Sequence, residues 1–304
     1  MIKENFTKMS SVQPDSVAAA TTEDRGVYHE GGKTGFLLIH GLSGTPVELR
    51  YIANGLARAG HTVYCPQLAG HCSTLDALTA TTWHDWYDSV ETALKRLSER
   101  CDHVFVGGLS MGAVLALRLA AQHPNVVNGT MLYAPTLWLD GWGVPWYSHL
   151  FRLVLQKRVA DLIWFSERPP FGIKDQRLRA IIAEAIHSGD PSKAGFLSIP
   201  GGPMFELRKL VKTVKGDLGG VTQPALILHP RQDDRASLRN AHYLEANLGG
   251  RVETVILEDS YHVITLDRQR DVVLGKTLGF AQAVAGRSVS ERAAGGVRRP
   301  IAAA

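Results

Sequence analysis

One short segment of the chain has the residue types and spacing of a nucleophile, the run Gly-Leu-Ser-Met-Gly at 108–112. A serine between two glycines at this spacing can stand at the tip of a sharp turn, where its hydroxyl can attack a carbonyl group. The segment 103–107 before it is β-branched and aromatic, and 113–121 after it has helix composition. This order predicts a strained strand-to-helix turn that presents Ser110, the alternative being an ordinary glycine-rich turn.

A nucleophilic serine needs a base to accept its proton and a carboxylate to orient that base. When a strand-to-helix turn of this kind carries the serine, the acid and then the histidine follow in chain order. His262 comes just after the last strand pattern, 252–257, and is the predicted base. Asp233 and Asp234 both follow the strand pattern that ends at His229. Spacing gives Asp233 a slight preference as the acid, and the other carboxylate is then a solvated turn or helix-cap residue.

Two backbone N–H groups are expected to bind the negative oxygen that develops on an attacked carbonyl. One belongs to Met111, the residue after the nucleophile. The other should come from the glycine-rich loop after the first buried strand, where Leu42 is the best candidate. His40, at the start of this loop, is interpreted as a structural residue that holds it.

The elements that must position these residues alternate between strand and helix patterns. Apolar or β-branched runs predict strands, whereas the segments between them have helical periodicity. The strand patterns lie at 35–40, 61–66, 103–107, 130–134, 225–229 and 252–257. This alternation predicts an α/β fold with a mainly parallel sheet and helices on both faces.

Two of the expected helices have bounds that the sequence indicates. The first starts with Thr45 as N-cap, Pro46 at the first helical position and Glu48 as the capping-box residue, and ends near Gly60. The last is expected from about residue 267 to 283.

The segment 137–220 interrupts the alternation, because it has no convincing strand and contains helices joined by Pro- and Gly-rich segments. A long irregular insertion in a compact domain is usually functional, so we expect a helical cap over the carboxyl ends of the strands. The cap is rich in aromatic residues, several of which are expected to line an acyl pocket, with core packing as the alternative for any one of them. These candidates are Trp138, Trp142, Trp146, Tyr147, Phe151, Trp164 and Phe165.

The domain organisation follows from these patterns. The α/β core is assigned to 27–136 and 221–285, with the cap insertion at 137–220. Residues 1–26 and 286–304 lack periodicity and are predicted to be disordered arms.

Composition excludes several classes of function. Of 304 residues 45% are hydrophobic and 20% charged, and the net charge of +4 comes partly from arginines near the C-terminus, so nucleic-acid binding is not expected. Three cysteines and no metal-ligand motif argue against a disulfide framework and a metal site. No signal peptide or membrane-spanning run is seen, which predicts a cytoplasmic protein without an integral membrane segment. A homodimer is left open.

Three segments together resemble the α/β-hydrolase superfamily and, within it, bacterial carboxylesterases of the monoacylglycerol-lipase type. They are Leu-Ile-His-Gly-Leu-Ser-Gly-Thr-Pro at 38–46, the serine run at 108–112 and His-Val-Ile-Thr-Leu-Asp at 262–267. The resemblance covers about 35–137 and 222–283. It implies Asp233 as the acid, from the Arg-Gln-Asp-Asp segment at 231–234, and the Leu42 and Met111 N–H groups as the oxyanion hole. Cys72 and Tyr261 stand where this superfamily usually has glycine.

These residues predict a serine carboxylic ester hydrolase that forms an acyl-enzyme on short- to medium-chain acyl esters and needs no cofactor. Its expected partner is a small-molecule ester. Two other reactions could use the same three side chains, namely carbon–carbon bond hydrolysis and acyl transfer to an acceptor other than water. A further alternative is a ligand-binding protein without catalysis, although such proteins usually lack one of the three side chains.

Overall fold

The structure is a computed structural model that describes residues 24–295, with side chains up to residue 286. Of the predicted N-terminal arm only 24–26 are described, as irregular chain, and β1 (Val27–His29) follows them. The rest of that arm, and 296–304 of the predicted C-terminal arm, lie outside the described residues.

A seven-stranded sheet forms the centre of the molecule, in the spatial order β1-β3-β2-β4-β5-β8-β9. All neighbouring strands are parallel except β1, which runs antiparallel to β3 at one edge. The parallel strands are β2 (Gly32–Ile39), β3 (His61–Cys65), β4 (His103–Leu109), β5 (Val127–Tyr133), β8 (Ala225–Pro230) and β9 (Val252–Leu257). The predicted α/β architecture is confirmed, with β1 as an edge strand too short to be recognised from its sequence.

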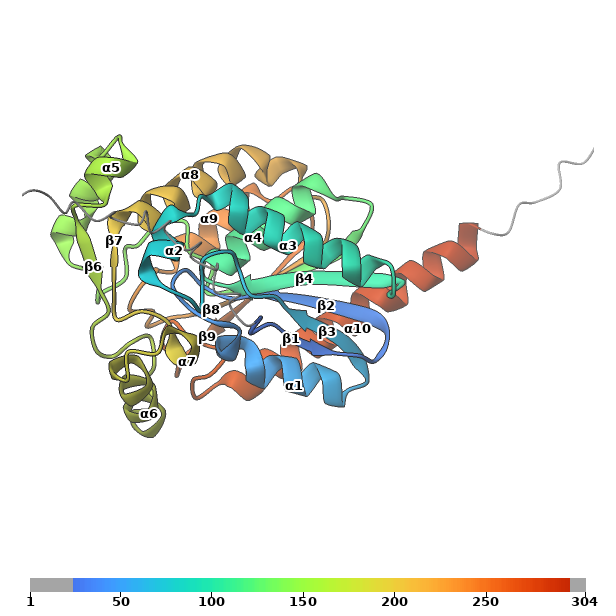
Figure 1. The fold of residues 1–304 in the computed structure, drawn as a ribbon. Helices are drawn as coiled ribbons and strands as arrows, with labels where there is room; N and C mark the ends of the chain where they lie inside the picture. Colours follow the sequence, from blue (N-terminus) through green and yellow to red (C-terminus); the bar gives the residue numbers. More distant parts are fainter. Residues whose placement is uncertain (1–23, 296–304) are drawn as a thin grey trace, which may run out of the picture.

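Helices cover both faces of the sheet (Figure 1). One face carries α1 (Arg50–Arg58) and α10 (Arg270–Gly295). The other carries α3 (Trp83–Ser98), α4 (Met111–Gln122), α8 (Gly201–Asp217) and α9 (Arg239–Asn247), and α2 (Leu75–Ala80) precedes α3. The two layers explain why residues 36–39 of β2 are all apolar: Leu37 and Ile39 pack toward α3 and α4, whereas Phe36 and Leu38 pack toward α1 and α10.

The insertion after β5 projects beyond one end of the sheet (Figure 1). It contains η2 (Trp146–Leu153), α5 (Lys157–Ala160), β6 (Trp164–Ser166), α6 (Gln176–His187), α7 (Pro191–Ala194) and β7 (Ser198–Pro200). β6 and β7 pair antiparallel, so the expectation of a purely helical cap without strands is wrong. Each strand has three residues, which is too short for a periodic pattern to reveal.

Helix ends also differ from the expectation. Helix α10 continues to Gly295, beyond the expected end near 283 and into the segment assigned to the C-terminal arm. The segment after Thr45 forms a short 3-10 helix, η1 (Pro46–Leu49), before α1 begins. Leu210 and Val214 of α8 belong to the same buried cluster as α3 and α4, so this helix packs with the core layer although it lies within 137–220, which ends with η3 (Leu218–Gly220). Among residues 24–295, no helix is long and apolar enough to cross a membrane.

Candidate active site

Ser110 lies at a tight turn between β4 and α4, at the carboxyl edge of the sheet. Its backbone has φ 58° and ψ −114°, a conformation that residues other than glycine rarely adopt and that a functional site can retain. A Cβ atom on Gly108 would lie 2.4 Å from the carbonyl oxygen of Ile39, and one on Gly112 only 2.0 Å from it. The two glycines are therefore required by the close approach of β2 to this turn.

His262 and Asp233 lie in the loops after the two neighbouring strands β9 and β8. The Nδ1 atom of His262 is 2.9 Å from Oδ2 and 3.0 Å from Oδ1 of Asp233, and both residues are buried. Oδ1 of Asp233 also accepts hydrogen bonds from the backbone N–H groups of Arg235 and Ala236, which fix the carboxylate. The structure thus brings together the histidine and the first of the two acids named from the sequence.

The charges in this pair favour a basic imidazole. Burial disfavours the charged form of His262, but the attraction and hydrogen bond of the Asp233 carboxylate outweigh it, so the pKa of His262 lies above its usual value. Burial opposes ionisation of Asp233 in the same way, and the neighbouring imidazole holds the pKa of Asp233 below its usual value. An imidazole in this setting is a competent proton acceptor.

Ser110 and His262 line one pocket. In the structure described, the hydroxyl of Ser110 donates to Oγ1 of Thr136, at 3.1 Å, and not to His262. Thr136 is buried, and its hydroxyl donates a hydrogen bond to the carbonyl of Ala134, at 3.2 Å. Hydrogen bonds of catalytic groups often form fully only when substrate is bound, and rotation about one side-chain bond redirects this hydroxyl.

The loop after β2 passes beside Ser110, and its residue Leu42 lines the same pocket as Ser110. A Cβ atom on Gly41 would lie 3.7 Å from Cβ of Ser110. Among the described residues, neither the Leu42 nor the Met111 backbone N–H has a hydrogen-bond acceptor, so both donors remain available for a developing oxyanion.

His40 holds this loop in place. Its Nε2 accepts the N–H of Leu68, at 3.3 Å, so Nδ1 carries the proton and donates to the carbonyl of Gly41, at 2.9 Å. Burial lowers the pKa of His40 to about 3, which keeps the ring neutral. The structural role expected for His40 agrees with these contacts.

Sequence reasoning missed two buried carboxylates that hold the loop of His262. Asp234, expected to be a solvated turn or cap residue, is 2% exposed and accepts the N–H groups of His262, at 3.3 Å, and of Gly172 in the cap, at 3.1 Å. Asp267 accepts the N–H groups of Tyr261 and of the cap residue Lys174. Each of these carboxylates accepts N–H groups from both the loop of His262 and the cap, and no sequence pattern shows that these donors lie side by side.

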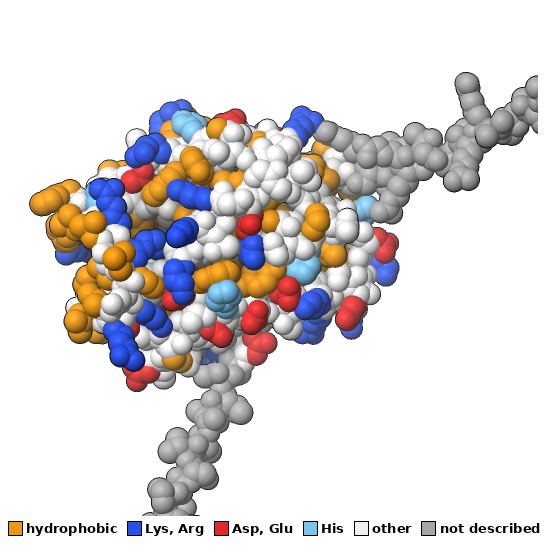
Figure 2. All heavy atoms as spheres, turned by 90° about the horizontal axis from the view of Figure 1, so that it is seen from above, with side chains coloured by type: hydrophobic (Ala, Val, Ile, Leu, Met, Phe, Trp, Pro, Cys, Tyr) orange, Lys and Arg blue, Asp and Glu red, His pale blue; other side chains and the backbone are white. Residues whose placement is uncertain are grey.

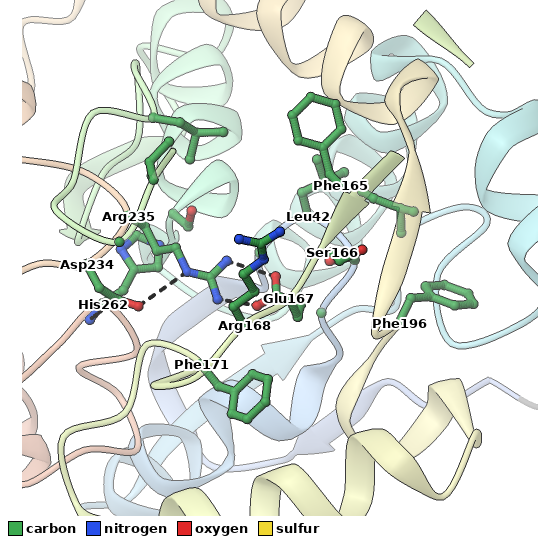
Figure 3. Close-up of a pocket in the computed structure, with 18 of the residues that line it drawn as sticks. Leu42, Phe165, Ser166, Glu167, Arg168, Phe171, Phe196, Asp234, Arg235 and His262 are labelled. Carbon is green, nitrogen blue, oxygen red and sulfur yellow. Dashed lines mark hydrogen bonds and ion pairs between the residues drawn. The ribbon is translucent and has the colours of Figure 1, made fainter. Parts of the chain in front are cut away.

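The pocket lies between the cap and the carboxyl edge of the sheet and has a volume of about 470 Å³. Glu167, which follows β6, forms a two-pronged ion pair with Arg235, and the two side chains point toward each other in Figure 3. Phe165 and Phe196 lie on the side of the pocket away from His262 (Figure 3), and further apolar side chains complete the lining. They include Leu150, Phe151, Ile163, Phe171, Ile182, Ile186 and Met204.

Of the seven aromatic residues named from the sequence, Trp138, Trp142 and Trp146 do not line this pocket, which corrects the expectation for these three. Trp138 packs against Tyr243 and under the amino group of Lys215. Trp142 donates from its indole N–H to a backbone carbonyl in the loop after β8, and Trp146 is 78% exposed. Composition indicated an aromatic cap but not the direction of each ring; the other four candidates, Tyr147, Phe151, Trp164 and Phe165, do line the pocket.

The outer surface of the cap is apolar. Figure 2 shows hydrophobic side chains gathered on the cap, at the left of the view, with Lys and Arg side chains among them. The exposed apolar residues of this region include Trp146, Leu150, Leu153, Leu155, Leu162 and Trp164.

The two departures from the superfamily pattern leave Ser110 and His262 in place. Cys72 adopts φ 57°, a conformation that usually favours glycine, and its thiol is free. Tyr261 stacks edge-on against Trp142 and lies beneath the amino group of Lys174, at a contact between cap and core. Its ring does not line the pocket.

A parallel sheet with a strained serine turn after one strand, and a buried His–Asp pair in the loops after two others, defines the α/β-hydrolase class. Comparison with known proteins agrees with this class. Residues 33–269 match the family described as serine aminopeptidase, S33 (Hydrolase_4), and the chain belongs to this family.

Individual relatives are more distant. The chain is 29% identical to the thermostable monoacylglycerol lipase of Bacillus sp. (strain H-257) over 254 residues, which cover 83% of this chain and 92% of the relative. It is 24% identical to a carboxylesterase of Bacillus subtilis (strain 168), with 80% and 90% covered. A solved structure described for the metagenome-derived lipolytic enzymes LipS and LipT is similar with a TM-score of 0.72 and 29% identity, covering 85% of this chain and 97% of that one.

Proposed function

We propose that this protein is a serine carboxylic ester hydrolase of the carboxylesterase or monoacylglycerol-lipase type. The observation that carries the proposal is the Asp233–His262 hydrogen bond in the pocket that also holds Ser110 on its strained turn. The lipolytic and esterase relatives support ester hydrolysis as the reaction.

The geometry supports a two-step acyl transfer. Ser110 Oγ attacks the ester carbonyl while His262 Nε2 takes its proton, and the carbonyl oxygen becomes an oxyanion that accepts from the Leu42 and Met111 N–H groups. The proton on His262 then passes to the leaving alcohol, and Asp233 stabilises the transient imidazolium. Water, deprotonated by His262, attacks the acyl-Ser110 carbonyl and releases the acid.

The pocket supports acyl chains of short to medium length. Its volume of about 470 Å³ is of the size that holds a small organic ligand, and most of its lining is apolar. The charged Glu167–Arg235 pair occupies one wall, so the apolar space for an acyl chain lies toward Phe165 and Phe196 (Figure 3). Monoacylglycerols with such chains are the substrates that we propose.

Hydrolysis of nitrophenyl acetate, butanoate, octanoate and palmitate by the wild type tests this proposal, with Ser110→Ala as the control. We expect the highest kcat/KM for butanoate or octanoate, because these chains bury apolar surface without exceeding the pocket. The Ser110→Ala variant should lose at least about 10³-fold in activity while remaining folded. Strict preference for acetate would contradict the acyl pocket, and full activity of the variant would contradict the reaction.

A further inference from the structure

Glu48 is a carboxyl group of the pocket wall that the proposed reaction does not use. The sequence assigns it to a capping box, but in the structure Thr45 alone caps η1, through the N–H of Val47. Oε2 of Glu48 instead accepts the backbone N–H of Gly41, at 3.1 Å. Glu48 therefore bonds to the loop that carries Leu42.

This loop is folded closely around the carboxyl group. A Cβ atom on Gly44 would lie 2.2 Å from Oε1 of Glu48, and one on Gly41 would lie 3.5 Å from Oε2. Gly41 thus lies close to both the carboxyl group of Glu48 and Cβ of Ser110. Among the residues that the structure describes, no side chain other than that of Glu48 accepts a hydrogen bond from a backbone N–H of the loop 41–44.

The direction of the Leu42 N–H follows from two such anchors. Glu48 fixes the N–H of Gly41, and His40 donates to the carbonyl of the same glycine. Because the peptide unit is planar and trans, fixing the Gly41 carbonyl directs the Leu42 N–H to the opposite side. That N–H has no acceptor among the described residues and is the donor proposed for the oxyanion.

The same residue is also connected to the loop of His262 and lies under the cap. Thr265 donates its hydroxyl to the backbone carbonyl of Glu48, at 2.7 Å. From the cap, Gly195 packs so closely on the loop that a Cβ atom there would lie 1.9 Å from the carbonyl oxygen of Ser43. The loop 41–44 is therefore packed against the cap and hydrogen-bonded to Glu48, which is itself hydrogen-bonded to the loop of His262.

We propose that Glu48 is a positioning residue of the oxyanion hole, which holds the Gly41 N–H so that the Leu42 N–H faces the carbonyl attacked by Ser110. This inference rests on the proposed ester hydrolysis. Because the hole acts on the charge that develops in the transition state, Glu48 should affect kcat rather than KM.

The charge of Glu48 adds a second effect. Burial raises the pKa of Glu48 to about 7, against the opposing hydrogen bond from Gly41 and the attraction of His262. The charged or titratable groups that face it are His262, Arg235, Glu167 and the thiol of Cys72. An ionised Glu48 favours protonated His262, so removal of this charge should lower the pKa of His262.

Two substitutions separate the hydrogen bond from the charge. Glu48→Gln keeps an oxygen that can accept the Gly41 N–H and removes the charge, whereas Glu48→Leu removes both. Glu245→Leu, at an exposed position on α9, is the matched control. For each variant, kcat and KM with nitrophenyl butanoate are measured across pH, together with the affinity for a trifluoromethyl ketone, whose adduct with Ser110 carries an oxyanion.

We expect Glu48→Leu to lose roughly 10- to 100-fold in kcat with little change in KM, and to bind the ketone more weakly by a similar factor. Glu48→Gln should keep kcat within about threefold and move the acid limb of the pH profile to lower pH. Unchanged kcat and ketone affinity in a folded Glu48→Leu protein would overturn the proposal.

Two further outcomes are informative. If Glu48→Leu does not fold, Glu48→Gln carries the test: because it keeps an acceptor for the Gly41 N–H, a lost kcat or weakened ketone binding in this folded variant would overturn the proposal. Wild-type hydrolysis that disappears in Ser110→Ala establishes the proposed reaction independently, so a failure of Glu48 alone is distinguishable. A wild type without esterase activity would overturn both.

Discussion

At the scale of single residues, the proposed chemistry depends on a buried imidazole that bonds to a carboxylate and shares a pocket with a serine hydroxyl. Nδ1 of His262 faces Asp233, so Nε2 is left to serve Ser110. In the structure the hydroxyl of Ser110 donates a hydrogen bond to Oγ1 of Thr136. Proton transfer to His262 therefore requires this hydroxyl to rotate when an ester binds.

The pH dependence of hydrolysis should report His262. The base form is required, and the pKa of His262 is raised above its usual value of 6.5 because Asp233 outweighs burial. A raised pKa means that activity is present above it and is lost as the pH falls through it. We expect kcat/KM to reach half its maximum above pH 6.5. A profile that is flat between pH 5 and 8 would contradict the assignment of His262.

At this scale, chain order predicts the three residues proposed for catalysis, because each had to follow a strand that ends at the same edge of the sheet. Order cannot reveal residues that act through backbone hydrogen bonds. Asp234 and Glu48 both have the appearance of cap or turn residues in the sequence. Their burial and their N–H partners are set by segments distant along the chain.

At the scale of elements, the loops after β8 and β9 and the cap segment after β6 form one hydrogen-bonded unit. Asp233 bonds the ring of His262, while the adjacent Asp234 bonds its backbone and that of Gly172. Asp233 thus orients the side chain of the proposed base, whereas Asp234 holds the backbone of the loop that carries it.

Exchange of each carboxylate for an amide should distinguish the role of Asp233 on the ring of His262 from the role of Asp234 on the loop backbone. Asp233→Asn should lower kcat by about 10³- to 10⁴-fold with little loss of stability, because the amide cannot stabilise an imidazolium. Asp234→Asn should cost far less activity but destabilise the fold by about 1–3 kcal/mol, since it weakens two buried N–H contacts. Kinetics and thermal unfolding of both variants check this; a larger kcat loss in Asp234→Asn would move the acid by one residue.

Elements with long apolar runs were predictable and short ones were not. The strands β2, β4 and β8 have long, mostly apolar runs that are buried on both faces, so their sequences could be recognised. β1, β6 and β7 have three residues each and depend on pairing with a distant partner. Helical periodicity likewise predicts α8 as a helix without indicating that it packs on α3 and α4.

At the scale of the whole molecule, the sheet supplies the proposed catalytic groups and the insertion supplies most of the pocket. The two parts meet through the Glu167–Arg235 ion pair and the Asp267 contacts. The chain is similar to lipolytic relatives, and the cap supplies most of the lining of the proposed acyl pocket. The side-chain directions that shape the pocket come from tertiary packing, which explains why the tryptophan prediction failed.

Covalent labelling tests whether Ser110 is a nucleophile that His262 activates. A fluorophosphonate should react with the wild type at one residue, identified as Ser110 by mass spectrometry of the digested protein. Labelling should be lost in Ser110→Ala and strongly slowed in His262→Ala. Labelling of another residue, or undiminished labelling of Ser110→Ala, would contradict the account.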